Sequence, residues 1–241
     1  MTVDQLTAPD AGVPPRRVGR PSTTPTESET ATPCSRCLTE PPRLTKIQTD
    51  SAKAEKTVSG TVAAASTGAH VKVELLNIQS LLPKLPDIRI DIQKRRPDIL
   101  CFVETNLKSS TPDRFLAIEG YRLFRQDRIT GRKKSGGGVA TYVKEDLQVE
   151  KLKLISSLGS ESHSESLWLK VKIDRKKAVI IACIYRPPSS SHSQTQADYN
   201  DIEEQIQQAI TAFPTQRIII AGDLNSDSLT NPTGYNRLIE L

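Results

Sequence analysis

The sequence predicts an α/β fold in which mixed β-sheets are covered by helices. Segments with strand-like patterns outnumber segments with helical patterns between residues 71 and 241. Helical segments separate some of the strands, as parallel crossovers require, whereas a short charged turn at 174–177 joins two strands as a hairpin. Because crossovers and hairpins occur together, we expect mixed sheets rather than one purely parallel sheet.

The expected strands are short runs that are rich in β-branched residues or strictly alternating. In the clearest case, Leu167, Leu169 and Val171 alternate with residues that include Trp168, which faces the other side. Strands are expected at 72–77, 98–103, 121–126, 139–143, 167–173, 179–185 and 217–222. Gly222 ends the last strand and lets the backbone turn sharply where it leaves the core.

Two segments carry apolar residues at helical spacing. In the segment 83–95, Leu85, Ile88 and Ile92 recur every three or four residues, and Pro97 follows a basic last turn and ends the helix. The second stripe consists of Tyr199, Ile202, Ile206, Ala209, Ile210 and Phe213. We expect both helices to cover the sheets.

Residues 1–70 differ in composition from the rest of the chain. They are rich in Thr, Ser, Pro and Ala, and all ten aromatic residues of the chain follow residue 70. Such a segment buries too little apolar surface to offset its ordering entropy, so we expect a disordered tail over 1–70 and one domain over 71–241. Cys34 and Cys37 have metal-ligand spacing but no second pair nearby, which favours free thiols. The segment 16–21 favours a plain basic patch over a minor-groove arm.

Composition also bounds the cellular setting. The N-terminus lacks the pattern of a secretory signal, and no apolar run reaches the length of a membrane span, so no membrane partner is expected. Cys101 and Cys183 lie inside expected strands, which indicates buried thiols in a reducing, intracellular compartment. The net charge of +5 is compatible with a polyanionic partner.

Oxygen-bearing side chains recur where four expected strands end. Asn77, Glu104 and Tyr185 each follow an apolar run, and Asp223 and Asn225 follow the last strand. Mg²⁺ prefers carboxylate and amide oxygens, with one or two protein carboxylates, and Glu104 with Asn77 supplies such a set. Asp223 suits a group that orients or deprotonates water, while Asn225 and the Tyr185 hydroxyl suit the stabilisation of developing charge. Taken alone, Asp223 and Asn225 equally fit an ordinary turn.

Several charged or flexible segments allow two interpretations. Arg125, Arg128 and Arg186 are candidate nucleic-acid contacts, although Arg125 and Arg128 with Asp127 equally suit a surface network. The basic clusters 132–134 and 175–177 suit phosphate contacts or solvated turns. The glycines at 136–138 allow either a close approach to DNA or a flexible hairpin entry, and the hairpin is favoured.

The chain resembles the endonuclease/exonuclease/phosphatase (DNase I-like) superfamily, and within it the apurinic-type endonuclease domain of non-LTR retrotransposons. The resemblance covers about residues 71–241. It rests on five motifs in the expected order: Asn77-Ile-Gln-Ser, Pro97-Asp-Ile-Leu-Cys-Phe-Val-Glu104-Thr, Gly136-Gly-Gly-Val-Ala, Ile184-Tyr-Arg-Pro-Pro188 and Gly222-Asp-Leu-Asn225.

The resemblance implies a four-layer α/β sandwich with a Mg²⁺ site, or a Mn²⁺ site, at one rim of two packed sheets. Glu104 is implied as the main metal ligand beside Asn77, and Asp223 as the residue that orients or activates water. Asn225 is implied to hold the scissile phosphate, and Tyr185 to stabilise the transition state. The implied reaction nicks one DNA strand and leaves a 3′ hydroxyl.

The chain departs from the family pattern after Asn225. The family's last strands and its Ser-Asp-His motif are not found before Leu241, so we expect a C-terminally truncated domain with an exposed apolar sheet edge. None of His70, His163 and His192 has the motif. Three functions therefore stay open: a nuclear DNA-nicking endonuclease of retrotransposon origin, a catalytically dead remnant that binds nucleic acid weakly, or a phosphatase or phosphodiesterase of the same superfamily.

Overall fold

The computed structural model describes residues 44–48, 57–63, 70–128, 136–154, 161–175, 177–189 and 191–226. The chain divides into two units, 1–38 and 39–241, and every described element lies in the second. The Cys34–Cys37 pair, the segment 16–21 and the cluster 132–134 lie outside the described residues. Among the described helices, none is long and apolar enough to cross a membrane.

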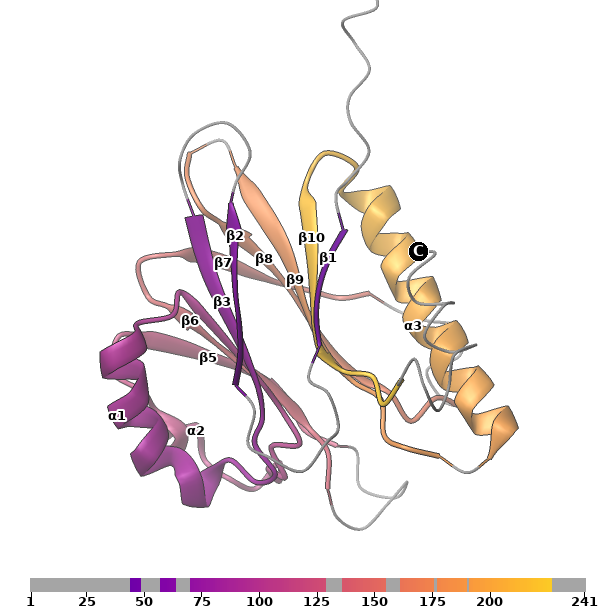
Figure 1. Ribbon diagram of the computed structural model, residues 1–241, viewed down its shortest axis with the longest axis horizontal. Helices are drawn as coiled ribbons and strands as arrows, with labels where there is room; N and C mark the ends of the chain where they lie inside the picture. Colours follow the sequence, from indigo (N-terminus) through magenta and orange to yellow (C-terminus); the bar gives the residue numbers. More distant parts are fainter. Residues whose placement is uncertain are drawn as a thin grey trace, which may run out of the picture. The chain divides into compact units, whose positions relative to one another are not determined.

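Two five-stranded sheets form the core of the second unit (Figure 1). The first sheet has the order β2 (Thr57–Ala63), β3 (His70–Asn77), β4 (Ile99–Val103), β6 (Val139–Lys144) and β5 (Tyr121–Gln126). The second has the order β1 (Leu44–Gln48), β10 (Arg217–Asp223), β9 (Ala178–Tyr185), β8 (Glu165–Lys172) and β7 (Gln148–Leu152).

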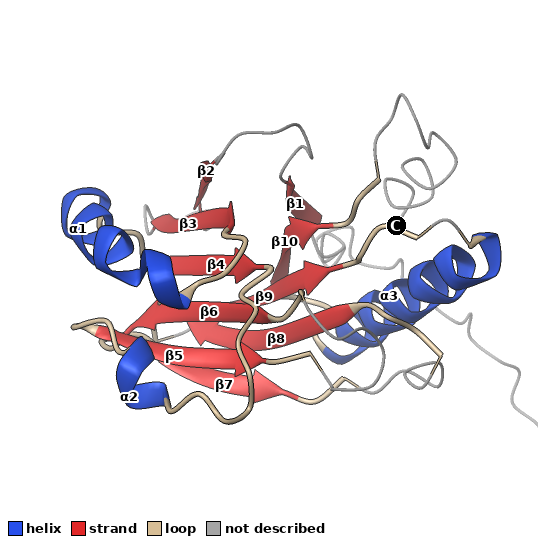
Figure 2. Cartoon of the chain, turned by 90° about the horizontal axis from the view of Figure 1, so that it is seen from below, coloured by secondary structure: helices blue, strands red, loops and turns tan. Residues whose placement is uncertain are grey.

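The sheets are mixed, as the sequence predicts. The pairs β3–β4, β9–β10 and β1–β10 are parallel, and the other described pairs are antiparallel. The short 3₁₀ turn η1 (Leu82–Lys84) leads into α1 (Leu85–Arg95), which provides the crossover from β3 to β4. The long helix α3 (His192–Ala212) provides the crossover from β9 to β10, and α2 (Asp113–Leu116) is a single turn. Figure 2 shows α1 and α3 beside different sheets.

Residue alternation along the central strands produces four layers. In β4, Ile99, Cys101 and Val103 belong to the core between the two sheets, whereas Leu100 and Phe102 belong to the core under α1. In β9 and β10 the same alternation divides residues between the inter-sheet core and the core under α3. Three apolar cores therefore separate helix, sheet, sheet and helix, which confirms the four-layer sandwich. Cys101 and Cys183 are free thiols buried in the inter-sheet core.

The expected tail boundary at residue 70 is wrong for two segments. Strands β1 and β2 lie inside 1–70, and each pairs along the edge of a strand of the main domain. Their low apolar content does not prevent order, because an edge strand gains backbone hydrogen bonds along the whole length of its neighbour. Strand β1 also covers β10, so the exposed apolar edge expected after residue 225 is not found there.

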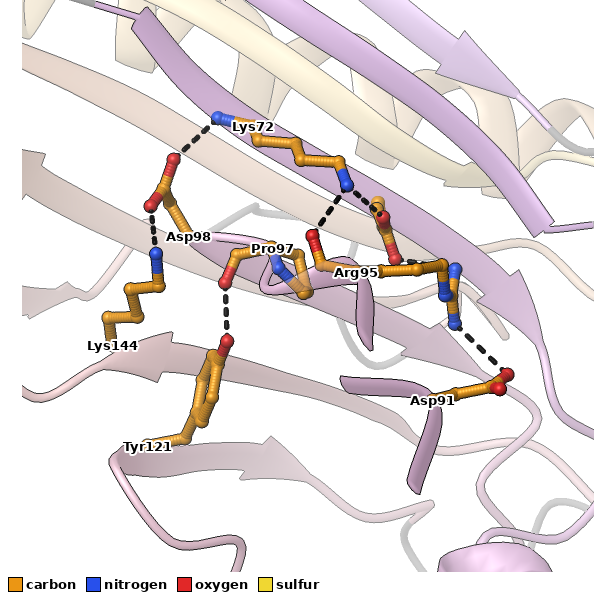
Figure 3. A network of polar contacts seen from close by, with 8 residues as sticks. Lys72, Asp91, Arg95, Pro97, Asp98, Tyr121 and Lys144 are labelled. Atoms are coloured by element: carbon orange, nitrogen blue, oxygen red, sulfur yellow. Dashed lines mark hydrogen bonds and ion pairs between the residues drawn. The ribbon is translucent and has the colours of Figure 1, made fainter. Parts of the chain in front are cut away.

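A polar network joins α1 to β3, β4, β5 and β6 (Figure 3). It lies at the ends of these strands opposite to the rim that carries Asn77 and Asp223. Glu74 is fully buried and forms ion pairs with Lys72 at 3.1 Å and Arg95 at 2.6 Å. Asp98 accepts hydrogen bonds from the Lys72 backbone N–H at 2.8 Å and from Lys144 Nζ at 2.6 Å. Since removing one partner of such a buried charge leaves the other uncompensated, this network fixes α1 against β3.

Gly222 offers a direct test of how closely β9 and β10 are packed. A Cβ atom at this position would lie 1.9 Å from the Ile184 carbonyl oxygen, which is backbone and cannot move away alone. We expect Gly222→Ala to destabilise the fold by about 2–3 kcal/mol or more in urea unfolding.

The matched control is Gly120→Ala. Gly120 has a φ of +77° but no atom within 4 Å of an added Cβ, so only backbone strain of about 1 kcal/mol is expected. Equal losses for the two variants would contradict the close packing at Gly222.

Candidate active site

The carboxyl ends of β3, β4, β9 and β10 bring the predicted side chains together. In the parallel ladders Asn77 pairs with Val103, directly before Glu104, and Asp223 pairs with Tyr185. The Asn77 amide nitrogen donates to Glu104 Oε1 at 2.8 Å and to Asp223 Oδ2 at 3.0 Å. The second bond joins residues 146 positions apart and crosses from one sheet to the other. The strand-end pattern in the sequence thus corresponds to one cluster in space.

The loops after these strands hold unusual backbone conformations. Six described non-glycine residues have positive φ angles, and five of them lie at this rim: Gln79, Ser80, Glu104, Asn106 and Asn225. Each such residue costs on the order of 1–3 kcal/mol and persists only where the surroundings fix it. Here Ser80 N–H donates to Glu104 O at 2.8 Å, and Asn106 N–H donates to Gly137 O at 2.8 Å. Clustering of this kind is typical of functional sites.

The donor set fits a hard divalent cation. The Asn77 Oδ1 atom is buried and has no hydrogen-bond partner, and it belongs to the side chain that joins Glu104 to Asp223. Mg²⁺ takes one or two carboxylates and amide oxygens from proteins, and Mn²⁺ accepts the same donors, so the Glu104 carboxylate with Asn77 Oδ1 suits such an ion. Among the described residues, no group of three or more His, Cys, Asp or Glu side chains is placed to hold a metal ion, so the proposed set depends on the Asn77 amide oxygen beside Glu104.

Burial raises the pKa of the titratable residues that end β9 and β10. The pKa of Asp223 is raised from its usual value because the carboxyl is buried, although hydrogen bonds from Asn225 N–H and Asn77 oppose this. The pKa of Tyr185 is also raised, first by burial and then by the neighbouring Glu104 carboxylate. Tyr185 therefore keeps its proton at neutral pH and is able to donate it in a hydrogen bond.

Asn225 is placed by the turn that follows β10. Its backbone N–H donates to Asp223 Oδ1 at 3.0 Å, and its side-chain nitrogen donates to the Arg186 carbonyl at 2.7 Å. Asn225 has a φ of +45°, a region that asparagine tolerates better than most residues. The expected contact between Asn225 and a phosphate stays a prediction.

Arg186 does not lie where a nucleic-acid contact requires it. The side chain is 2% exposed, and its guanidinium donates to the carbonyls of Leu224 at 2.6 Å and Asn225 at 2.5 Å. It also lies 4.8 Å from the centre of the Tyr199 ring. The expectation of a direct contact is wrong because the turn after β10 covers this arginine and uses its donors. Arg186 holds the turn that carries Asn225.

The other two predicted arginines have different surroundings. Arg128 forms an ion pair with Glu165 and lies 5.8 Å from the centre of the Tyr185 ring, so it places a positive charge beside the site. Arg125 is paired with Asp113 at 3.1 Å and Asp127 at 3.6 Å, which supports the surface network. A nucleic-acid contact by either arginine stays a prediction.

Glu165 is a site residue that the sequence analysis missed. It is 9% exposed, accepts from Gly138 N–H at 2.6 Å and pairs with Arg128. It opens β8 and lies opposite Tyr185 in the antiparallel ladder. The available signal was the hairpin itself, because in an antiparallel pair the start of one strand lies beside the end of the other.

The glycines 136–138 serve a packing role that neither sequence interpretation anticipated. All three have positive φ angles. A Cβ on Gly137 would lie 2.3 Å from the Arg128 guanidinium, and one on Gly138 would lie 2.5 Å from Thr105 Oγ1. Glycine at these positions lets the loop before β6 lie against the loop after Glu104.

Comparison with known proteins gives a family match over most of the chain. The model of the Endonuclease/Exonuclease/phosphatase family matches residues 75–237. No curated protein sequence matches the chain. Among solved structures, the catalytic domain of human Nocturnin with bound sulfate is 15% identical with a TM-score of 0.54, covering 69% of this chain and 67% of that one.

Two further structures have the same fold. The endonuclease domain of TRAS1, a telomere-specific non-LTR retrotransposon, is 15% identical with a TM-score of 0.50, covering 70% of this chain and 68% of that one. A mannosyl-6-phosphatase from Bacteroides thetaiotaomicron is 18% identical with a TM-score of 0.51, covering 66% and 61%. At these identities the likeness shows the fold.

The raised pKa of Asp223 predicts how metal binding depends on pH. The ionised Asp223 carboxylate accepts a hydrogen bond from the Asn77 amide, so it places a negative charge beside the proposed cation site. Its protonation removes that charge and weakens cation binding as the pH falls. Because burial raises this pKa above the usual value of 3.8, Mn²⁺ affinity should already fall at a pH where an ordinary aspartate stays ionised. Titration of Mn²⁺ by electron paramagnetic resonance between pH 4 and 8 measures this. Identical affinity for the parent and Asn77→Ala would contradict the proposed ligand set.

The contacts of Arg186 predict that a conservative substitution loosens the turn at Asn225 without unfolding the sheets. Arg186→Lys keeps the charge but loses the planar fork that reaches two carbonyls, so the Asn225 turn should loosen while both sheets stay folded. Amide hydrogen exchange of residues 223–226 should accelerate about tenfold or more, with little change at β4. Unchanged exchange at 223–226 would show that the Arg186 guanidinium does not stabilise the turn.

Proposed function

The chain belongs to the endonuclease/exonuclease/phosphatase family, whose members hydrolyse phosphate and phosphodiester bonds, and we propose that it is a metal-dependent endonuclease that nicks DNA. One observation carries the proposal. The Asn77 amide joins Glu104 of one sheet to Asp223 of the other. The protonated Tyr185 lies next to both carboxylates, because it pairs with Asp223 in the ladder and the Glu104 charge raises its pKa. This arrangement combines a cation site, a basic carboxylate and a hydroxyl donor, which together suit hydrolysis of a phosphodiester.

Each residue has a role that its surroundings support. Glu104 and Asn77 would hold Mg²⁺ or Mn²⁺, which when bound polarises a phosphate oxygen. Asp223 accepts the proton of an attacking water, and its raised pKa brings its basicity closer to the working pH. Tyr185 donates a hydrogen bond to the phosphate oxygens, and Arg128 beside the ring offsets their developing negative charge.

Support for DNA as the substrate comes from motifs and charge. The segments Tyr185-Arg-Pro-Pro188 and Gly222-Asp-Leu-Asn225 resemble those of retrotransposon endonuclease domains, and the TRAS1 endonuclease domain has the same fold. The net charge of +5 favours a polyanion. We infer an origin in a retrotransposon and a nuclear place of action, where that substrate is found.

Two other functions compete with this one. A phosphatase has the same fold, as the mannosyl-6-phosphatase illustrates, so hydrolysis of a phosphomonoester is the first alternative. The second is a catalytically inactive remnant that binds nucleic acid weakly, for which the net charge of +5 is sufficient.

A nicking assay on supercoiled plasmid with Mg²⁺ separates these functions. We expect conversion to open circles by the parent and a loss of about a hundredfold or more for Glu104→Gln and for Asp223→Asn. Glu150→Gln, which changes an exposed glutamate on β7, is the matched control. Hydrolysis of p-nitrophenyl phosphate without nicking would favour a phosphatase. An inactive parent that still binds DNA would favour the remnant, and equal nicking by all variants would refute the site.

A further inference from the structure

The strands that carry Asn77 and Asp223 each have an outer neighbour from the N-terminal part of the chain. Along β10, residues Leu44–Gln48 pair in parallel with 218–222. Along β3, residues Thr57–Ala63 pair antiparallel with 70–76. Both outer strands lie outside the region 75–237 that the family model matches. We call these two strands, residues 44–48 and 57–63, the edge segment.

The edge segment connects the same two strands that the site joins. Strand β1 contacts β2 as well as β10, and β10 contacts β3. Strand β1 ends at Gln48, beside Gly222, and β2 begins at Thr57, beside Leu76. Both positions are one residue away from a side chain of the site. Figures 1 and 2 show β1 and β2 on the same side of the two sheets, at the edges formed by β10 and β3.

Without the edge segment, the outer edges of β10 and β3 would be free to pair with strands of other molecules. Strand β10 contains the apolar run 218–221, whose residues are all buried, and β3 contains the buried run 73–76. An edge of this length exposes a row of unpaired N–H and C=O groups, to which another strand adds readily. Natural edge strands avoid this with charged residues, prolines or bulges. Neither run contains a proline, and the charged residue in the β3 run, Glu74, is buried and paired with Lys72 and Arg95.

We propose that the edge segment covers the edges of β10 and β3 within one chain, and that these edges pair with a second copy when its strands are displaced. This pairing keeps the two strands that carry Asn77 and Asp223 in fixed register with their sheets. This inference concerns the fold and is independent of the proposed nuclease activity.

Hydrogen exchange of the full chain tests the pairing without any substitution. Residues 44–48 and 57–63 should exchange at least about tenfold more slowly than unstructured peptides of the same sequence, because their amides lie in sheet ladders. Exchange at the rate of an unstructured peptide in both strands would overturn the proposal.

Paired prolines test the consequence in the full chain. Adjacent residues of a strand point their N–H groups to opposite sides, so one of two neighbouring prolines removes a donor whichever way the strand lies. Lys46→Pro with Ile47→Pro targets β1, and Ser59→Pro with Gly60→Pro targets β2. Thr23→Pro with Thr24→Pro, in the unit 1–38, is the matched control.

Each strand variant should open one edge and leave the other intact. We expect faster exchange of 217–223 in the β1 variant and of 70–77 in the β2 variant, with dimers or larger species in light scattering after size exclusion. The control should stay like the parent. The near-ultraviolet dichroism of buried Trp168 reports whether each variant is folded. Folded variants that stay monomeric would overturn the proposal, as would unchanged exchange at β10 and β3. A double variant that unfolds is replaced by its two single-proline versions, which are judged by the same outcomes.

Discussion

The hydrogen bonds of one amide, that of Asn77, depend on the packing of the whole domain. The donor reaches Glu104 on its own sheet and Asp223 on the other sheet only because the two sheets lie face to face. That spacing is set by the inter-sheet core, where the inward residues of β3, β4, β9 and β10 interdigitate. A cavity or an added methyl group in this core would therefore change the distance between the two carboxylates before it changed any residue of the site.

The site is assembled at a cost to stability that the surrounding contacts offset. Burial raises the pKa values of Asp223 and Glu165, which means that their charged forms are disfavoured where they stand. A raised pKa makes the folded state bind protons more readily than the unfolded state, so ionising either group at neutral pH opposes folding. The positive φ angles at Glu104 and Asn225 add strain. The Arg186 contacts with the Asn225 turn and the Gly137 contact with Asn106 hold this strained rim in place.

The strands and the residues at their ends were predictable because they depend on short residue patterns. The apolar residue patterns of β4, β9 and β10 predicted these strands. Parallel crossovers place the carboxyl ends of neighbouring strands at one rim, so the sequence also predicted that Asn77, Glu104, Tyr185 and Asp223 lie close together. Glu165 was missed because its position depends on which strand pairs with β9. Arg186 was assigned to nucleic acid because an arginine after a strand looks the same whether it faces solvent or a buried turn. Strands β1 and β2 were missed because pairing, and not their own composition, orders them.

The two misassigned regions have a common physical origin. Arg186 and the edge segment both satisfy backbone groups that the main fold leaves open: the carbonyls of the turn after β10 in one case, and the outer edges of β10 and β3 in the other. Every buried backbone donor and acceptor needs a partner, so each uncovered carbonyl or edge requires some other part of the chain. For strand β10, which carries Asp223, the edge partner comes from outside the matched family region. The geometry of the Asn77–Asp223 pair thus depends on residues that a family boundary would omit.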